Sequence, residues 1–295
     1  MSTENEIRDF LTTRRAKVTP ERAGLPTFGR HRRVAGLRRE EVALLAGISV
    51  EYYTRLERGN ARGVSEGVLD SVATALLLDD AERQHLVDLA RTANAAVAPP
   101  RRPSAAHKIR PSIARLVDSM TGVAAMVRNG RLDLLYANDL GRALFSDIFR
   151  DPRGPNTARF TFFDPAARSF WSDWDRAASD TVAFLHAEAG RNPYDKPLTD
   201  LIGELSTRSD EFRVRWALHD VKNHRSGVKT LRHPLVGELE LVFEALELPA
   251  DPGLMLATYA PAPGASSEGR FQELAQWAST RARLAPSDPM AEVRA

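Results

Sequence analysis

Apolar positions recur every three to four residues over most of the first third of the chain, which is the pattern of helices that bury one face. This spacing predicts helices over residues 5–15, 38–46, 50–58 and 65–78 and over a fifth stretch that starts at residue 79. Gly47 suits the left-handed turn that ends the second helix, and Ser49 and Ser65 suit the N-caps of the next two. We therefore expect residues 1–92 to form an all-α bundle of five helices.

The pattern changes in the second part of the chain, where short runs alternate with a period of two, as strands do. It predicts strands over residues 123–127, 132–137, 228–231, 236–247 and 254–259, and helices over 139–145, 173–189, 198–219 and 268–278. Residues 93–112 separate the two patterns, and because they are rich in Ala and Pro they predict a linker. Residues 113–295 are expected to form a second, α+β domain.

Charge is distributed unevenly between these two domains. The net charge of the whole chain is +2, but residues 1–62 hold 13 Lys and Arg against 8 Asp and Glu. Part of this excess is the basic run Arg30–Arg33. A basic module on a near-neutral body favours an anionic partner for that module, although a solvated basic face would give the same count.

Several classes of chemistry are disfavoured by composition. The chain has no Cys, which excludes disulfides, cysteine-ligated zinc, iron–sulfur clusters and thiol nucleophiles. It has no HExxH, no GxSxG and no Gly-rich phosphate loop, so we expect no catalysis, metal or cofactor, and an enzyme fused to a binding module is the least favoured alternative. It also lacks a long apolar run and a secretory signal, so we expect a cytoplasmic protein with no membrane partner.

The most informative segment is Arg39–Gly59, in which a helix, a glycine turn and a capped second helix follow one another. This is the plan of a helix-turn-helix, and it needs a small residue such as Ala43 where the two helices cross. Gly47 makes the turn, and Ile48 can fill the core below it. The pattern predicts binding to double-stranded DNA, with an ordinary helical hairpin as the alternative.

This segment resembles the Cro/repressor-like, or XRE-type, family of bacterial regulators, whose second motif helix lies in the major groove. The resemblance implies that DNA is contacted by Arg38, Arg39, Ser49, Val50, Glu51, Tyr52, Thr54, Arg55, Arg58 and Arg62. Val50, Glu51, Thr54 and Arg55 become the base readers. Arg55 would donate to guanine and Glu51 would accept from cytosine, whereas Arg39 would bind a phosphate. Glu57 is expected to be a structural partner of the motif.

The second domain resembles the actinobacterial regulators with a MmyB-like C-terminal domain. Its most diagnostic run is Leu231–Leu239, supported by Leu201–Ser206 and His219–Val221, and the family resemblance covers almost the whole chain. A departure at Tyr194–Lys196 affects only a variable stretch. The resemblance implies a PAS-like domain that binds an apolar, fatty-acid-like ligand. Because helix-turn-helix proteins usually bind two operator half-sites as symmetric dimers, we also expect a homodimer.

Apolar and aromatic side chains dominate the second domain and are the candidates for lining such a pocket. The candidate lining is Leu134, Tyr136, Asn138, Trp174, Phe184, Phe212, Trp216, His219 and Phe243. A carboxylate ligand would need donors nearby, and the candidate anchors are Asn138, Arg215, His219 and Lys229. Two alternatives remain open. These side chains can simply form a packed core, and the domain can act only by dimerising or binding a protein.

Overall fold

A computed structural model describes residues 3–26, 34–94, 109–220 and 226–284. The basic run Arg30–Arg33 and most of the predicted linker lie outside these residues. The chain folds into two compact units. The helical unit comprises residues 1–103 and 179–223, and the sheet unit comprises residues 104–178 and 224–295. Residues 179–223 therefore cluster with the N-terminal helices, although they follow the first half of the sheet unit in the sequence.

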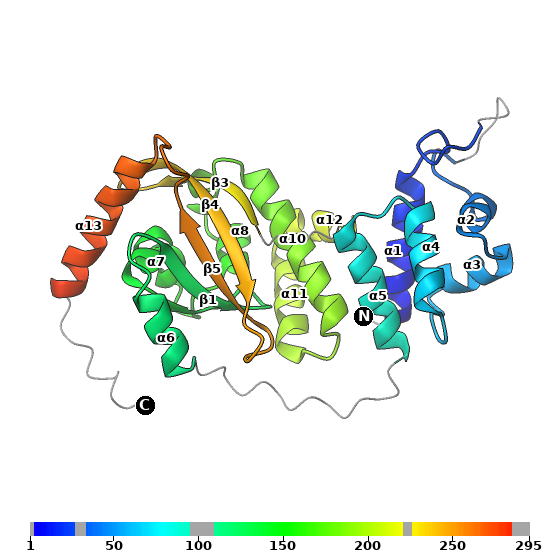
Figure 1. The fold of residues 1–295 in the computed structure, drawn as a ribbon, viewed down its shortest axis with the longest axis horizontal. Coiled ribbons are helices and arrows are strands. Elements are labelled where there is room, and N and C mark those ends of the chain that lie inside the picture. Colours follow the sequence, from blue (N-terminus) through cyan, green and yellow to red (C-terminus); the bar gives the residue numbers. More distant parts are fainter. Residues whose placement is uncertain (1–2, 27–33, 95–108, 221–225, 285–295) are drawn as a thin grey trace. The chain divides into compact units, whose positions relative to one another are not determined.

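Each of the five helices predicted in the N-terminal region is present among the described residues (Figure 1). They are α1 (Thr3–Lys17), α2 (Arg39–Ala46), α3 (Val50–Glu57), α4 (Glu66–Ala75) and α5 (Asp80–Asn94). The remainder of the helical unit is most of α10 (Trp174–Arg191), from Ser179 onwards, with α11 (Lys196–Arg208) and α12 (Asp210–Trp216). The core of this unit is formed by side chains of α1 to α5, among them the fully buried Ile7, Phe10, Tyr53 and Leu56, and it also includes Ala187 of α10.

Local signals explain where α2 and α3 begin and end. Gly47 has a φ of 66°, a left-handed conformation that glycine adopts without a steric penalty, and it ends α2. The hydroxyl of Ser49 accepts a hydrogen bond from the Tyr52 amide at 3.1 Å and so caps α3. The turn is followed at once by a capped helix, as the sequence predicts.

The sheet unit contains a five-stranded antiparallel sheet in the order β2-β1-β5-β4-β3. Its strands are β1 (Ala124–Asn129), β2 (Leu134–Ala137), β3 (Ser226–His233), β4 (Gly237–Glu247) and β5 (Leu254–Ala260). Its helices are α6 (Pro111–Asp118), α7 (Asp139–Leu144), α8 (Thr157–Phe163), α9 (Ala167–Phe170), the start of α10 and α13 (Glu268–Leu284), with a short 3₁₀ turn at Ile148–Arg150. None of the described helices is long and apolar enough to cross a membrane.

The two faces of the sheet are covered differently. Side chains from α7, α8, α9, α10 and α13 form the large apolar core on one face, together with inward-facing residues of the strands. A smaller apolar cluster on the other face contains Val117 of α6 and Val127 of β1. Along β4 the alternation is strict, because Leu239, Leu241 and Phe243 are buried while the residues between them are exposed.

The prediction of one helix over residues 198–219 is wrong in one respect. The segment is broken at Ser209, which has an extended backbone (φ −133°, ψ 111°) and separates α11 from α12. The Ser209 hydroxyl accepts a hydrogen bond from the Phe212 amide at 3.1 Å, so this serine is the N-cap of a new helix. A further helix, α6, starts at Pro111, a position where the missing proline N–H costs no helical hydrogen bond.

Candidate nucleic-acid interface and ligand-binding region

The outer face of α3 gathers the predicted base readers on one surface. Tyr53 and Leu56 are fully buried against the core, which fixes the rotation of the helix. The opposite face lines a shallow depression formed by Val50, Glu51, Thr54, Arg55, Arg58 and Asn60. All four predicted base readers belong to this set. Asn60, which the sequence argument missed, lies just past the end of the motif, where no periodicity marks it.

Arg55 is held in place on this surface by an aromatic neighbour. Its guanidinium lies over the Tyr52 ring, 4.8 Å from the ring centroid, in a cation–π arrangement. Because Tyr52 is fixed on α3, this contact limits the positions that the Arg55 side chain adopts. The hydroxyl of Ser49 is already engaged in capping α3. Within the predicted set, Ser49 therefore orders the helix through its side chain, and Arg55 is presented at its surface.

Beneath this surface lies a buried carboxylate, Glu57, whose side chain is only 1% exposed. It accepts a hydrogen bond from Arg15 Nε at 2.5 Å and another from Arg39 Nε, and the Tyr53 hydroxyl lies 3.5 Å away. Burial, and then the charge of Glu57, raises the pKa of the Tyr53 hydroxyl, which stays protonated. Glu57 is thus a structural partner of the motif, as the sequence predicts.

This carboxylate positions the predicted phosphate contact. Arg39 remains 48% exposed although its Nε is bound by Glu57, so this arginine is accessible at the surface. Arg38, Arg58 and Arg62 are also exposed. Arg38 lies 3.3 Å from Glu40 through its Nη1 atom, an exposed pair that leaves it available to a phosphate.

The nine predicted ligand-lining residues are divided between the two units. Leu134, Trp174 and Phe243 lie together in the large apolar core of the sheet unit. Tyr136 packs instead with the smaller cluster on the other face, and its hydroxyl donates to Asp118 at 2.7 Å. Burial and this hydrogen bond raise the pKa of Tyr136 to about 12. Phe184, Phe212, Trp216 and His219 belong to the helical unit.

Asn138 has a local role that occupies its whole amide. Its Oδ1 accepts hydrogen bonds from the Gly141 amide at 2.8 Å and from the Ala125 amide at 3.1 Å. Its Nδ2 donates to the carbonyls of Val123 and Met120 at 2.9 and 3.1 Å. The side chain therefore ties the start of α7 to β1 and to the turn before it.

The large core of the sheet unit also holds an aromatic cluster that was not predicted from the sequence. Its rings pack at centroid distances of 5.0 to 6.5 Å and belong to Phe145, Phe160, Phe170, Trp171 and Tyr259. Lys229 of β3 lies 5.5 Å from the Trp171 ring and 4.8 Å from the Phe243 ring. The Trp171 Nε1 is buried and has no hydrogen-bond partner among the described residues. The sequence showed only that Phe160, Phe170 and Trp171 are close in the chain.

Two family models match the chain, and they correspond to the two predicted functions. A helix-turn-helix domain model matches residues 27–86, which include the whole surface around α3. A second model, the MmyB-like transcription regulator ligand binding domain, matches residues 109–274. No curated protein matches the chain.

These findings define the protein as a DNA-binding transcription regulator with a ligand-binding domain. Because the second model covers more than half of the sequence, the chain belongs to the family of regulators with a MmyB-like ligand-binding domain. Both models describe regulatory modules rather than enzymes.

Proposed function

We propose that this regulator binds a specific operator in double-stranded DNA by placing α3 in the major groove. The observation that carries this proposal is the outer face of α3, where Arg55 is stacked on Tyr52 within the depression that also includes Glu51 and Thr54. In the groove, Arg55 reads a guanine through its O6 and N7 atoms, and Glu51 accepts from a cytosine amino group. Val50 and Thr54 offer apolar contact to a thymine methyl group.

Phosphate contacts then set the register of the helix on the duplex. Arg39, oriented by Glu57, binds one phosphate, and Arg38, Arg58 and Arg62 bind others. These contacts raise affinity for every sequence and make binding depend on salt. The protein acts as a homodimer whose two α3 helices contact half-sites about 34–36 Å apart.

For the second domain we propose a PAS-like fold that binds a fatty-acid-like ligand. An antiparallel sheet with helices across its main apolar face is the architecture that supports this. Lys229 supplies a cation for a carboxylate, and the Trp171 N–H is a buried donor without a partner among the described residues. The apolar chain would lie among the aromatic rings of the large core.

One observation favours a second candidate, in which this domain binds no small molecule and acts by dimerisation or by binding a protein. The rings of Phe145, Phe160, Phe170 and Trp171 contact one another directly, which is the arrangement of a filled core. Native mass spectrometry of the purified full chain separates the two, because a bound fatty acid adds its own mass.

A matched binding experiment tests the same point. Lys229→Gln should weaken binding of a long-chain fatty acid but not of the alcohol of equal chain length, because the variant removes only the charge. If neither compound binds the wild-type chain, the protein-partner function is the one that remains.

The DNA proposal is tested by selecting duplexes from a random library with the full chain. Enrichment of a two-fold symmetric site supports it, and failure to enrich any sequence would contradict it.

A further inference from the structure

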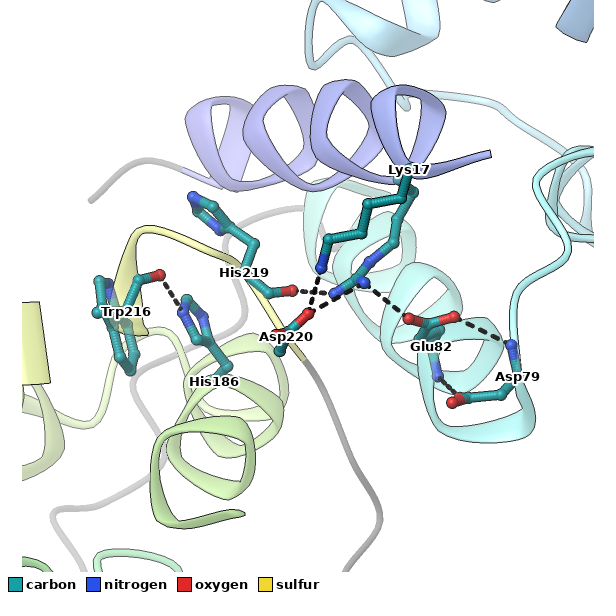
Figure 2. Close-up of polar contacts among 8 residues, drawn as sticks. Lys17, Asp79, Glu82, His186, Trp216, His219 and Asp220 are labelled. Carbon is teal, nitrogen blue, oxygen red and sulfur yellow. Dashed lines mark hydrogen bonds and ion pairs between the residues drawn. The ribbon is translucent and has the colours of Figure 1, made fainter. Parts of the chain in front are cut away.

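A buried arginine ties α1 to the end of the α12 region. Arg14 is only 5% exposed, and its Nη1 lies 2.9 Å from Glu82 of α5 and 3.2 Å from the Asp220 carboxylate. Figure 2 labels these two acidic residues. Its Nη2 donates to the His219 carbonyl. Lys17, one turn further along α1, lies 2.5 Å from the same Asp220 oxygen. Although burial alone would raise the pKa of Asp220, Lys17 and Arg14 outweigh it and the pKa is lowered.

A second set of contacts joins α5 to α10. A Cβ atom on Gly190 would lie 2.6 Å from the ring of His85, so the backbone of α10 approaches this buried ring as closely as only glycine allows. Arg191 lies 3.5 Å from Asp88 of α5, and the Thr92 hydroxyl lies 3.5 Å from the Gly190 carbonyl. These contacts use polar groups and close packing together, so they fix how α10 lies against α5.

Two histidines of this region, His85 and His186, pack as neutral rings. Burial lowers the pKa of both His85 and His186 to about 3, so both are neutral at physiological pH. His186 stacks on Trp216 with centroids 3.6 Å apart, and its Nε2 bonds the Trp216 carbonyl at 2.8 Å. Within the described part of the chain no three His, Asp or Glu side chains are grouped to hold a metal ion.

The segment that makes these contacts is part of the family match for ligand binding. Residues 179–220 lie within the matched range 109–274, yet they fold with α1 and α5 in the helical unit. We call residues 179–220 the control arm. Through α10 the arm is continuous in sequence with Trp174 and Ala178, which belong to the apolar core of the sheet unit, whereas Ala187 belongs to the core of the helical unit.

On its other side, α1 reaches the DNA-binding surface. Arg15 follows Arg14 directly, and it binds Glu57 at 2.5 Å, while Arg15 Nη1 donates to the Leu37 carbonyl at 2.9 Å. Glu57 in turn holds Arg39. A contiguous chain of ion pairs and one helix therefore leads from Asp220 through Arg14 and Arg15 to Glu57 and Arg39.

We propose that the control arm regulates DNA binding by holding α1 in place through the Arg14–Asp220 ion pair, which we call the clamp. When this ion pair breaks, α1 can shift, and the shift disturbs the Glu57–Arg39 pair. This inference rests on the proposed operator binding and names its regulation. Because the Arg14–Asp220 pair is coupled to Arg39, which binds a phosphate, DNA binding stabilises this ion pair. By the same coupling free energy, the ion pair stabilises DNA binding.

The test compares Asp220→Asn with Asp200→Asn in the full chain. Both aspartates lie on the control arm, and both are well exposed, 44% and 61% by side chain, so both variants should fold. Asp200 pairs only with Lys196 in the described contacts, through an i, i+4 pair on α11. Each variant removes one negative charge, which by itself does not weaken the attraction to DNA in either variant.

The duplex is one that the wild-type chain selects from a random library. The clamp predicts that Asp220→Asn binds it about threefold to fivefold more weakly than wild type, against the electrostatic trend, while Asp200→Asn does not weaken binding. If both variants bind the duplex with the same affinity, or if both bind it more tightly by the same factor, the proposed regulation by the control arm is overturned.

A second pair of variants tests the α5–α10 contact independently. Gly190→Ala forces a methyl group against the His85 ring, whereas Gly203→Ala on α11 places its methyl group in open space. Gly190→Ala should weaken binding of the selected duplex and speed amide hydrogen exchange over residues 209–220, and Gly203→Ala should do neither.

Unchanged binding and exchange in Gly190→Ala would contradict the inference. If the wild-type chain selects no duplex, the proposal of operator binding is contradicted, and so is the proposal that the control arm regulates it. If the wild-type chain selects a duplex and all four variants bind it with the same affinity as wild type, only the proposed regulation by the control arm is contradicted.

Discussion

Arg14 and Arg15 are consecutive residues on α1, yet their guanidinium groups bind carboxylates from different parts of the chain. Arg14 pairs with Glu82 and Asp220, and Arg15 pairs with Glu57 at the end of α3. Successive positions on a helix differ by about 100° in direction, so one turn of α1 serves two networks. Helix α1 is therefore both a scaffold for the helix-turn-helix and its link to the control arm.

The Glu57 network predicts a stability effect. Glu57→Gln keeps the shape of the side chain but removes the charge shared by Arg15 and Arg39, which leaves the largely buried Arg15 donor poorly matched. We expect a loss of about 1–3 kcal/mol in the free energy of unfolding. Glu40→Gln is the control, because Glu40 is exposed and pairs only with Arg38 in the described contacts, and its effect should be under about 0.5 kcal/mol. Urea denaturation of both variants measures the difference, and equal stabilities would contradict a structural role for Glu57.

The stacking of Arg55 on Tyr52 predicts a change in specificity. Tyr52→Ala removes the ring that holds Arg55, whereas Tyr52→Phe keeps it. An exposed cation–π contact is worth about 0.5–1 kcal/mol, so Tyr52→Ala should lose about twofold to fivefold of the preference at the base that Arg55 reads. Competition binding with operator variants measures this preference. If Tyr52→Phe loses as much as Tyr52→Ala, the hydroxyl and not the ring is what matters.

The buried histidines predict a pH dependence of stability. His85 and His186 have pKa values lowered from 6.5 to about 3, chiefly by burial. Between these two pH values the two histidines bind protons in the unfolded chain but not in the folded chain. Stability is therefore complete above pH 6.5 and falls as the pH drops from 6.5 towards 3. The titratable and charged groups that act on His85 are His186, Arg14, Arg191 and His219, and all of them lower its pKa.

Each buried histidine contributes a slope on the order of 1 kcal/mol per pH unit within that window. Urea unfolding at pH 7 and at pH 5.5 measures the combined slope. In His85→Leu the slope should be smaller, because the variant removes one of the two groups whose pKa is lowered in the folded chain. A variant slope equal to that of wild type would show that His85 titrates normally.

Much of the fold could be predicted from local signals in the sequence. The turn at Gly47, the cap at Ser49 and the alternation along β4 depend on neighbouring residues, and the structure has them where the sequence predicts them. The break at Ser209 was missed because apolar periodicity continues across it and only the cap reveals it.

What the sequence did not reveal depends on distant pairs. Arg14 and Asp220 are 206 positions apart, and no periodicity or motif connects them. The same holds for Gly190 and His85, whose close approach is visible only in three dimensions. The candidate ligand residues illustrate the converse, since Tyr136 and Phe243 shared an aromatic character but pack on opposite faces of the sheet.

The most direct test of the central claim is the base preference of Arg55→Ala, measured on every single-base variant of the selected operator, beside Arg58→Ala as a control from the same surface. We expect Arg55→Ala to lose about 1–3 kcal/mol of discrimination at one guanine position, whereas Arg58→Ala should weaken binding to all sequences alike. Uniform weakening by Arg55→Ala, with the base preferences intact, would contradict the assignment of α3 as the helix that reads the operator.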